Sequence, residues 1–325
     1  TYETSSQEGS RAFESIYENL ITNYSRPDDY QQSAILYICG GNACDTDAFQ
    51  DLKQWRHQQG FTVYTALTNE IGDSEGAIAY HIQNAYDNFN PSPEYVTLVG
   101  DVQGNYSIPT HAYNNPDCNG GPTWGGNTSY GDYPYTLVDG DDLISDILIG
   151  RLSVMSEYEL DVVVIKLISY EQAIYMDYMD NAWYERAALS INTNGNSGLS
   201  FYNTNESIEY MMTNAGMSDI RTYYGGGYAS WLSNRLDEGI LYLNHRDWSG
   251  GTNFDEYYID SANNGFQLPF VTLITCWTNF FNLDVGYEVA EYIFKAGSVN
   301  NPQGGIAAVG MAGSTHTLFN NIIDM

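Results

Sequence analysis

A cysteine and a histidine each follow a block of apolar residues in the second half of the chain. Cys276 comes directly after the segment 269–275, and His245 follows the segment 239–244. Short apolar segments of this kind, rich in β-branched and aromatic residues, are typical of buried strands. A cysteine nucleophile needs a neighbouring base and a partly exposed position where a strand meets a loop. Because ligands bind at the carboxyl ends of parallel strands, the two residues are candidates for one catalytic site.

Both residues also have a non-catalytic interpretation. Cys276 could be a buried small apolar residue, and His245 a hydrogen-bonded structural residue. His316 follows another apolar segment, at 306–311, and is the second candidate for the base. The sequence leaves the choice between these two histidines open.

Alternating strand and helix patterns run along the whole chain. In the first half, the apolar periodicity predicts strands at 34–38, 61–65, 95–99 and 146–150, with helices at 45–59, 74–89 and 157–175. In the second half, it predicts strands at 186–192, 219–224, 240–244, 270–275 and 306–311, with helices at 204–215, 229–237 and 286–296. Such alternation favours right-handed crossovers and mostly parallel sheets. We expect an α/β protein with two subdomains, residues 1–178 and 179–325, the second carrying the Cys/His site.

The charge balance excludes several classes of partner. The chain has 11 Lys and Arg against 41 Asp and Glu, a net charge of −30, so binding to nucleic acid or to an anionic membrane is disfavoured. A hydrophobic content of 43% argues against disorder, and no apolar run reaches the length of a membrane span. Charged residues make up only 16% of the chain, and much of its polarity comes from uncharged residues and 29 tyrosines, which suggests an extracellular protein or one from a salty environment. An extracellular or cell-surface location is our expectation. The chain begins at Thr1 and not at a methionine, so we expect a processed part of a longer precursor.

The cysteines carry a further prediction about the compartment. Cys39 and Cys44 bracket a short loop and could close a small disulfide in an oxidising environment. Four cysteines allow three pairings if all are oxidised, and the partner of Cys118 stays open.

A dense acidic segment is a candidate metal site. Four aspartates fall between residues 139 and 146, namely Asp139, Asp141, Asp142 and Asp146. Calcium prefers several oxygen ligands on a tight loop, although the spacing here is not that of an EF-hand. A structural Ca²⁺ ion is therefore one expectation, and an acidic solvated turn is the other. Thiol chemistry itself requires no cofactor.

Several segments, taken in their order and spacing, resemble the gingipain family of cysteine peptidases. The matching stretches are 49–60, 95–101 followed by Ile108-Pro109, 149–153, 267–270 leading to Thr275-Cys276, and 304–308. They extend over nearly the whole chain. The resemblance implies a caspase-like topology, with mostly parallel sheets flanked by helices in two side-by-side α/β subdomains. It also implies a cysteine nucleophile, at the position of Cys276, and a histidine base. Calcium binding in the family supports the metal expectation.

The chain departs from the family pattern near the base and in the specificity pocket. Gap-free matching around Asn244 places Trp248 where the family has its histidine, three residues after His245. Met155 stands at the position of the acid that assists the histidine, and Ile165 at that of the acid that selects basic side chains. We therefore expect an apolar or polar preference in place of one for arginine or lysine. Ile165, Trp248 and Trp277 are the expected substrate-binding residues.

The sequence thus predicts a secreted or surface cysteine endopeptidase that acts on polypeptides through Cys276 and a histidine. A transpeptidase would use the same acyl-enzyme chemistry. The alternative from another class is an inactive surface module that binds protein or glycan through loop aromatics such as Trp124, Trp248 and Trp277. Flanking domains or processed fragments of the same precursor are further expected partners.

Overall fold

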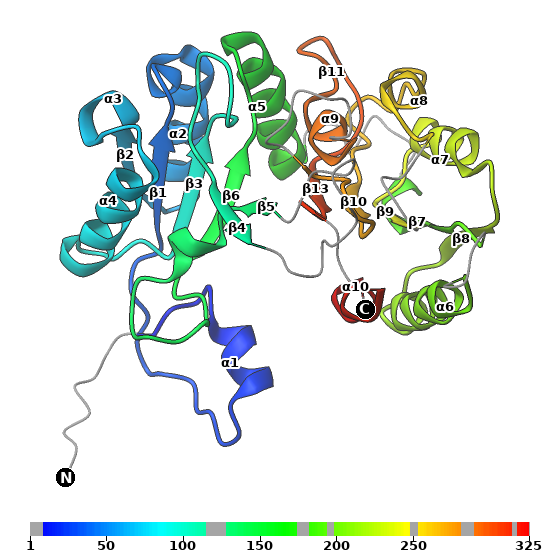
Figure 1. The fold of residues 1–325 in the computed structure, drawn as a ribbon, viewed down its shortest axis with the longest axis horizontal. Helices are drawn as coiled ribbons and strands as arrows, with labels where there is room; N and C mark the ends of the chain where they lie inside the picture. The colour runs from blue at the N-terminus through cyan, green and yellow to red at the C-terminus, as the bar shows by residue number, and fades with distance from the viewer. Residues whose placement is uncertain are drawn as a thin grey trace. The chain divides into compact units, whose positions relative to one another are not determined.

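The chain folds into two α/β units in a computed structural model (Figure 1). The structure describes residues 9–114, 128–173, 182–193, 198–247, 253–280, 289–313 and 317–324. Unit 1 comprises residues 1–111 and 132–160, and unit 2 comprises residues 112–131 and 161–325. The boundary expected near residue 178 lies outside the described residues. None of the helices in the described ranges is long and apolar enough to cross a membrane.

Unit 1 is built on a four-stranded parallel sheet of order β2-β1-β3-β6. Its strands are β1 (Ala34–Cys39), β2 (Thr62–Leu67), β3 (Tyr95–Val99) and β6 (Leu148–Leu152). The helices are α1 (Glu14–Leu20), α2 (Asp47–Gln58), α3 (Thr68–Ile71) and α4 (Glu75–Asn88), and α5 (Glu157–Gln172) follows β6. Every residue of β1 is buried, because this central strand is covered on both faces.

Side-chain caps set the start of the two main helices of this unit. The Thr46 hydroxyl accepts a hydrogen bond from the backbone N–H of Phe49 at the start of α2, and Ser74 accepts one from Ala77 at the start of α4. The buried face of α4 then packs against β1 and β3 in one apolar core, which includes Ile78, Ile82, Ala85, Leu36, Ile38 and Leu98. The predicted strands and helices of this half are therefore present, with ends that shift by one to three residues.

The segment between β3 and β6 contains short elements. Strands β4 (His111–Asn114) and β5 (Thr128–Gly131) form a two-stranded sheet, and a 3₁₀ turn spans Tyr133–Thr136. Strands of four residues surrounded by Asn, Pro and Gly give too little periodicity to be recognised in the sequence.

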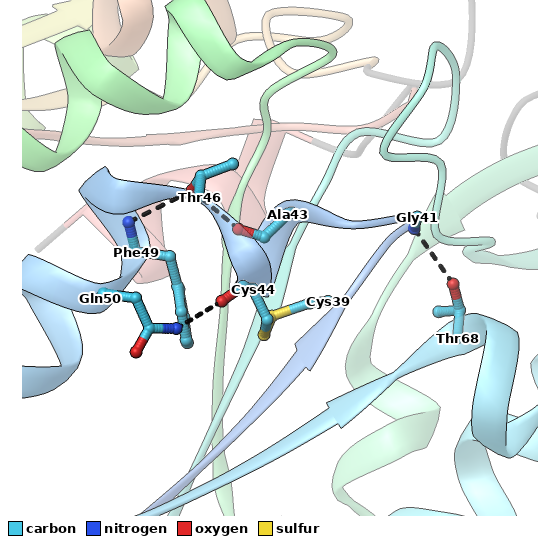
Figure 2. The surroundings of a disulfide bond; sticks show 8 residues. All are labelled: Cys39, Gly41, Ala43, Cys44, Thr46, Phe49, Gln50 and Thr68. Carbon is cyan, nitrogen blue, oxygen red and sulfur yellow. Dashed lines mark hydrogen bonds between the residues drawn. A yellow bond between two sulfur atoms is a disulfide. The ribbon is translucent and has the colours of Figure 1, made fainter.

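A disulfide closes the turn after β1 (Figure 2). Cys39 ends the strand, Cys44 lies in the 3₁₀ turn Ala43–Asp45, and their Cα atoms are 5.6 Å apart. The Gln50 side chain donates a hydrogen bond of 2.7 Å to the carbonyl oxygen of Cys44, which ties the turn to α2. The pairing allowed by the spacing is thus present. Cys118 lies outside the described residues.

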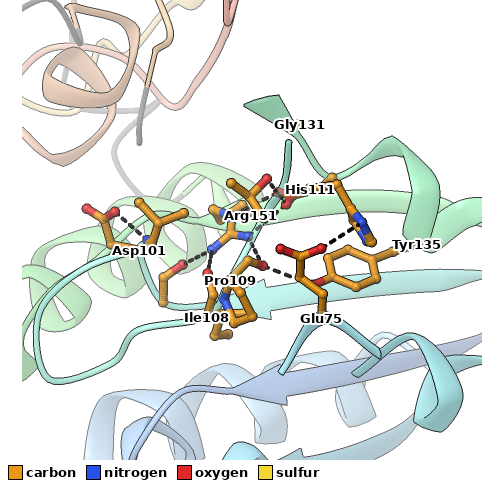
Figure 3. A network of polar contacts seen from close by, with 12 residues as sticks. Glu75, Asp101, Ile108, Pro109, His111, Gly131, Tyr135 and Arg151 are labelled. Carbon is orange, nitrogen blue, oxygen red and sulfur yellow. Dashed lines mark hydrogen bonds and ion pairs between the residues drawn. The ribbon is translucent and has the colours of Figure 1, made fainter. Parts of the chain in front are cut away.

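Arg151 of β6 fastens the loop that follows β3 (Figure 3). Its guanidinium donates to the carbonyl oxygens of Gly100 at 2.9 Å, Ile108 at 3.0 Å and Pro109 at 3.3 Å. Two further N–H groups reach the two oxygens of Asp132, each at 2.8 Å. The Arg151 side chain is 7% exposed, so its charge is compensated almost entirely by protein atoms. The carboxyl end of the sheet is therefore held by one fully satisfied cation.

Unit 2 contains a five-stranded parallel sheet of order β13-β10-β9-β7-β8. Its strands are β7 (Arg186–Ile191), β8 (Asp219–Tyr224), β9 (Tyr242–Arg246), β10 (Phe270–Leu273) and β13 (Ala307–Gly310). The helices are α6 (Gly198–Asn214), α7 (Tyr228–Asp237), α8 (Glu256–Asp260), α9 (Val289–Lys295) and α10 (Thr317–Asp324). A small antiparallel pair, β11 (Gly297–Ser298) with β12 (Asn301–Pro302), follows α9.

The two faces of this sheet are covered differently. Apolar side chains such as Leu243, Val271 and Leu273 pack in one core with residues of α7, α8 and α9. Neighbouring residues of a strand point to opposite faces, so Asn244 lies on the other face, where its amide is 3.4 Å from Asn205 of α6. The face that packs against α7, α8 and α9 is therefore apolar in the middle of the strands, and the other face contains buried polar groups. Near the strand ends, the buried polar residues Ser190 and His245 lie on the first face.

A buried lysine links α5 to the segment after α9. Lys166 is 1% exposed, and its ammonium donates to the carbonyl oxygens of Phe294 at 2.6 Å, Gln303 at 2.7 Å and Ala296 at 3.3 Å. Burial lowers the pKa of this ammonium to about 7. Three acceptors match its three donors, so each N–H group of the charged form has a partner.

Arg246, at the end of β9, anchors the last helix of the described chain. Its guanidinium donates to the carbonyl oxygen of Ile274 and, at 2.6 Å, to the side-chain oxygen of Asn321 in α10. It lies 4.4 Å from the centre of the Phe201 ring and 3.6 Å from the carboxylate of Asp324. Burial raises the pKa of Asp324 to about 6, although Arg246 opposes the shift.

We expect Arg151→Met to lower the free energy of unfolding by roughly 3 kcal/mol, because it removes the cation that pairs with the buried Asp132 carboxylate and the donor to the carbonyl oxygens of Gly100 and Ile108. Asp132 and Pro109 would keep only their hydrogen bonds from Thr110 and Tyr135. Urea denaturation followed by circular dichroism measures the change. Arg26→Met is the matched control: that side chain is 67% exposed, and solvent screens its ion pair with Glu18, so its loss should change stability much less. Equal losses in the two variants would contradict the assigned role of Arg151.

The Asp324 carboxyl should make stability fall as the pH rises from about 4 to about 6. Its folded pKa lies above the unfolded value, so the folded state binds more protons in this window and loses that advantage as they dissociate. Relative to Asp324→Asn, the wild type should lose roughly 3 kcal/mol between pH 4 and pH 7. Denaturation of both proteins across this range tests the expectation. Parallel stability curves would show that the carboxyl does not titrate in this way.

Candidate active site

The candidate nucleophile lies where two neighbouring parallel strands end. In the register of β9 and β10, His245 is opposite Leu273, and Cys276 follows three residues later. Beyond the strands, the backbone N–H of Asp247 donates a 2.7 Å hydrogen bond to the Thr275 hydroxyl. The segments that leave the two strands are therefore held together next to Cys276. Its side chain is half-buried, and it is not part of a disulfide.

The turn that carries Cys276 is tied to the chain beyond β13. The Thr278 hydroxyl lies 2.6 Å from the carbonyl oxygen of Leu273 and accepts a 3.2 Å hydrogen bond from the backbone of Met311. Trp277, the residue after the candidate nucleophile, has φ +68°, in the left-handed region that bulky residues rarely adopt. Such backbone strain concentrates at functional sites, where the surrounding contacts hold it in place.

The expected substrate-binding residues have different surroundings. Trp277 is 9% exposed, and its ring packs edge-on against Phe280 at 4.8 Å, which in turn packs against Tyr130 at 5.3 Å. The indole thus packs within the protein, and its contact with substrate stays a prediction. Ile165 is half-buried on α5. Trp248 lies outside the described residues.

His245 is not in the loop where the sequence analysis placed it. The prediction ended the strand at residue 244, whereas β9 extends from Tyr242 to Arg246, so His245 is a strand residue with no exposed surface. Its Nδ1 is 2.7 Å from the Ser190 hydroxyl oxygen of β7, and its ring lies 4.0 Å from that of Tyr228. The strand continues through these polar residues because partners on neighbouring elements satisfy them.

The other ring nitrogen of His245 faces an acid. Nε2 is 3.8 Å from the Asp247 carboxylate and has no hydrogen-bond partner among the described residues. Asp247 is itself buried and accepts a 2.6 Å hydrogen bond from the Tyr228 hydroxyl. Ser190, His245, Asp247 and Tyr228 therefore form a buried polar cluster, which the Asp247–Thr275 contact connects to the Cys276 turn.

A cation that the sequence analysis did not single out also lies near the thiol. Burial lowers the pKa of Arg246, while the negative charges of Asp324, of a Cys276 thiolate and of Asp247 raise it. Arg246 also binds the carbonyl oxygen of Ile274, two residues before Cys276. The guanidinium therefore holds the backbone directly before the thiol. The available sequence signal was the His-Arg-Asp triplet directly after an apolar run.

The second candidate for the base, His316, lies outside the described residues. The structure therefore places only one of the two histidines. His245 and Cys276 belong to neighbouring strands and share the Asp247–Thr275 contact, but Ser190 and Tyr228 are the residues that hold the imidazole directly.

The aspartates of the acidic segment mainly shape their own turn in unit 1. Asp146 accepts hydrogen bonds from the backbone of Val138 at 3.0 Å and Asp139 at 2.9 Å, and Asp142 accepts one from Ile144 at 2.8 Å. Within the described ranges, no group of three or more His, Cys, Asp or Glu side chains is placed to hold a metal ion. A calcium ion held by Asp139, Asp141, Asp142 and Asp146 stays a prediction.

The model of peptidase family C25 matches residues 28–324 of the chain. Among curated proteins, gingipain R2 of Porphyromonas gingivalis is 23% identical over 317 residues, which cover 91% of this chain and 40% of that protein. Gingipain R1 of the same species is 22% identical, again over 91% of this chain but 30% of its own length. The chain therefore spans less than half the length of these relatives.

Solved structures show the same fold at low sequence identity. The crystal structure of the Arg-specific cysteine proteinase gingipain R has a TM-score of 0.72 at 20% identity and covers 88% of this chain and 64% of that one. The complex of the pro- and mature domains of RgpB from Porphyromonas gingivalis has a TM-score of 0.71, also at 20% identity, over 89% and 68% of the two chains. The predicted fold class, with mostly parallel sheets flanked by helices, is thereby confirmed. Since the family model covers nearly the whole sequence, the chain belongs to peptidase family C25.

Proposed function

We propose that this chain is a cysteine endopeptidase of the gingipain type, with Cys276 as its nucleophile. The observation that carries the proposal is the position of Cys276: half-buried, at the carboxyl end of a central parallel strand, and followed by a strained residue in a chain of family C25. Arg246 supports it, because its buried guanidinium binds the carbonyl oxygen of Ile274 and so holds the backbone directly before Cys276.

The reaction would proceed in two steps. The Cys276 thiolate attacks the carbonyl carbon of the scissile peptide bond, and the oxyanion is stabilised by nearby backbone N–H groups. The histidine, which holds the thiol proton, gives it to the departing amine as the C–N bond breaks and a thioester forms. Water, deprotonated by the same histidine, then attacks the thioester and regenerates the thiol. A transpeptidase would differ only in using an amine in place of water.

His245 and His316 remain the two candidate bases. Three contacts support His245: it is one strand away from the nucleophile, its Nε2 is unpartnered within the described chain, and Asp247 supplies a counter-charge at 3.8 Å. His316 follows β13, the strand on the other side of β10. We favour His245, with Asp247 and Ser190 orienting its ring.

The proposed substrate preference and location follow from separate features. Ile165 and Met155 stand where the gingipain pattern has acids, so the proposed enzyme prefers apolar or polar side chains over arginine and lysine. The Cys39–Cys44 disulfide supports an oxidising compartment and hence an extracellular or cell-surface location. The proposed partners are a polypeptide substrate and other parts of the same precursor.

The thiol should react far faster than a free cysteine. We expect the native protein to react with iodoacetamide at neutral pH and to cleave labelled casein, and Cys276→Ala to abolish both. His245→Gln should lower the cleavage rate 10²- to 10⁴-fold if His245 is the base, and His316→Gln should do so instead if His316 is. Circular dichroism of each variant separates a catalytic loss from unfolding. A folded protein with an inert thiol would overturn the proposal and favour the inactive binding module.

The specificity proposal has its own test. On fluorogenic peptides that differ only in the residue before the scissile bond, kcat/KM should be at least tenfold higher for leucine or asparagine than for arginine or lysine. Ile165→Asp should raise the relative rate on arginine, because it places a carboxylate in the pocket, whereas Ile165→Asn should not. Efficient cleavage after arginine by the unmodified protein would contradict the assignment of Ile165 to the pocket.

A further inference from the structure

A second site candidate lies in unit 1, where a cavity of about 680 Å³ separates the N-terminal segment from the sheet. Its wall includes Phe13 and Tyr17 near α1, together with Glu94, directly before β3, and Asp146, just before β6. The cavity is therefore at the amino ends of these strands, opposite to the loop that Arg151 holds. Its volume is in the range of small-molecule sites.

The charges on the cavity wall are all negative. Glu94, Asp139 and Asp146 line it, and its lining contains no lysine or arginine. Glu94 is 3% exposed, and one of its oxygens accepts a hydrogen bond from the Ser10 hydroxyl. The other, Oε2, is buried and has no hydrogen-bond partner among the described residues. Because an unpaired buried carboxylate oxygen is costly, the cavity is suited to a ligand that donates to it.

Aromatic rings form much of the remaining wall. Phe13 stacks on Tyr17 at 5.9 Å between ring centres, and Tyr17 packs against Tyr24 at 5.7 Å. Tyr86 of α4 completes this group. Burial and then the charge of Tyr24 and Asp146 raise the pKa of Tyr17, so its hydroxyl lies within electrostatic range of the carboxylates. Aromatic faces beside carboxylates attract organic cations more than inorganic ones.

The donor set does not fit a metal ion. Calcium takes six to eight oxygens within a tight shell, yet the structure brings no three acidic, histidine or cysteine side chains of the described chain together for that purpose. One Asp146 oxygen is already used by the backbone of Val138 and Asp139. Carboxylates spread along an aromatic wall suit an elongated ligand with a charged end.

We propose that this cavity binds a primary ammonium group carried on an alkyl chain, with Glu94 as the principal counter-charge. The ammonium donates to the free oxygen of Glu94, and the alkyl chain lies along Phe13, Tyr17 and Tyr24. Asp139 and Asp146 add longer-range attraction. A free alkyl diamine and the side chain of a peptide lysine share this chemistry. The proposal is independent of Cys276 and of the peptidase function.

Isothermal titration calorimetry tests this site with 1,5-diaminopentane and with N-acetyl-lysine amide, using Cys276→Ala protein so that no ligand is cleaved. We expect at least one amine to bind and neutral 1,5-pentanediol not to bind. Glu94→Gln should weaken amine binding tenfold or more, because it removes the counter-charge and keeps the shape. Asp51→Asn is the matched control, since Asp51 is exposed on α2 and does not line the cavity.

A second variant keeps the proposal testable if Glu94→Gln protein does not fold. Asp139 is exposed, so Asp139→Asn should leave folding intact and weaken binding about twofold to threefold through the longer-range charge. Tighter binding of the diamine would identify a free diamine as the ligand, and tighter binding of the lysine amide would identify a peptide lysine. Absence of binding by either amine, equal affinity in Glu94→Gln protein, or displacement of the amine by stoichiometric Ca²⁺ would each overturn the proposal.

Discussion

Buried cations that bind backbone carbonyl groups hold the loops of both units in place. Arg151, Lys166 and Arg246 are almost completely buried, and each donates to carbonyl oxygens from segments distant in the sequence. The chain has 11 cationic residues against 41 acidic ones, so three fully buried cations are a substantial share. A buried ammonium or guanidinium without partners would cost several kcal/mol. These carbonyl groups must therefore stay in place. Arg151 and Arg246 hold segments at the carboxyl ends of the sheets, and Lys166 holds the connection between α9 and β13.

One of these buried cations, Arg246, also holds the backbone next to the candidate active site. Arg246 binds the carbonyl oxygen of Ile274, so the backbone just before Cys276 is fixed by a buried cation. Thr278 and Met311 fix the other side of the turn. The strained backbone of Trp277 can persist because both flanks are held. The position of the Cys276 turn therefore depends on contacts on both of its sides.

Apolar periodicity was sufficient to predict most of the strands and helices along the chain, but not the ends of polar strands. The strand at Asp219–Tyr224 was predicted with its observed bounds, and Cys276 was correctly placed beyond an apolar strand. The end of β9 was wrong because Asn244, His245 and Arg246 resemble a loop in sequence, and only partners on other elements make them strand residues. The roles of Ser190 and Asp247 could not be predicted for the same reason. Contacts between neighbouring strands leave no periodic signal in either segment.

The net charge does not show where the acidic side chains gather. A charge of −30 spread evenly would favour basic ligands everywhere, but the candidate specificity position in unit 2 carries Ile165. In unit 1, by contrast, Glu94 and Asp146 are separated by 52 residues (146 − 94) and are brought together only because β3 and β6 are adjacent parallel strands. Parallel pairing of β3 and β6 thus places loops together at the carboxyl ends of the strands and carboxylates together at their amino ends. Recognition of a cationic group therefore belongs to the amino ends of this sheet, where the sequence alone indicated the acidic segment with Asp139 and Asp146 but not its association with Glu94.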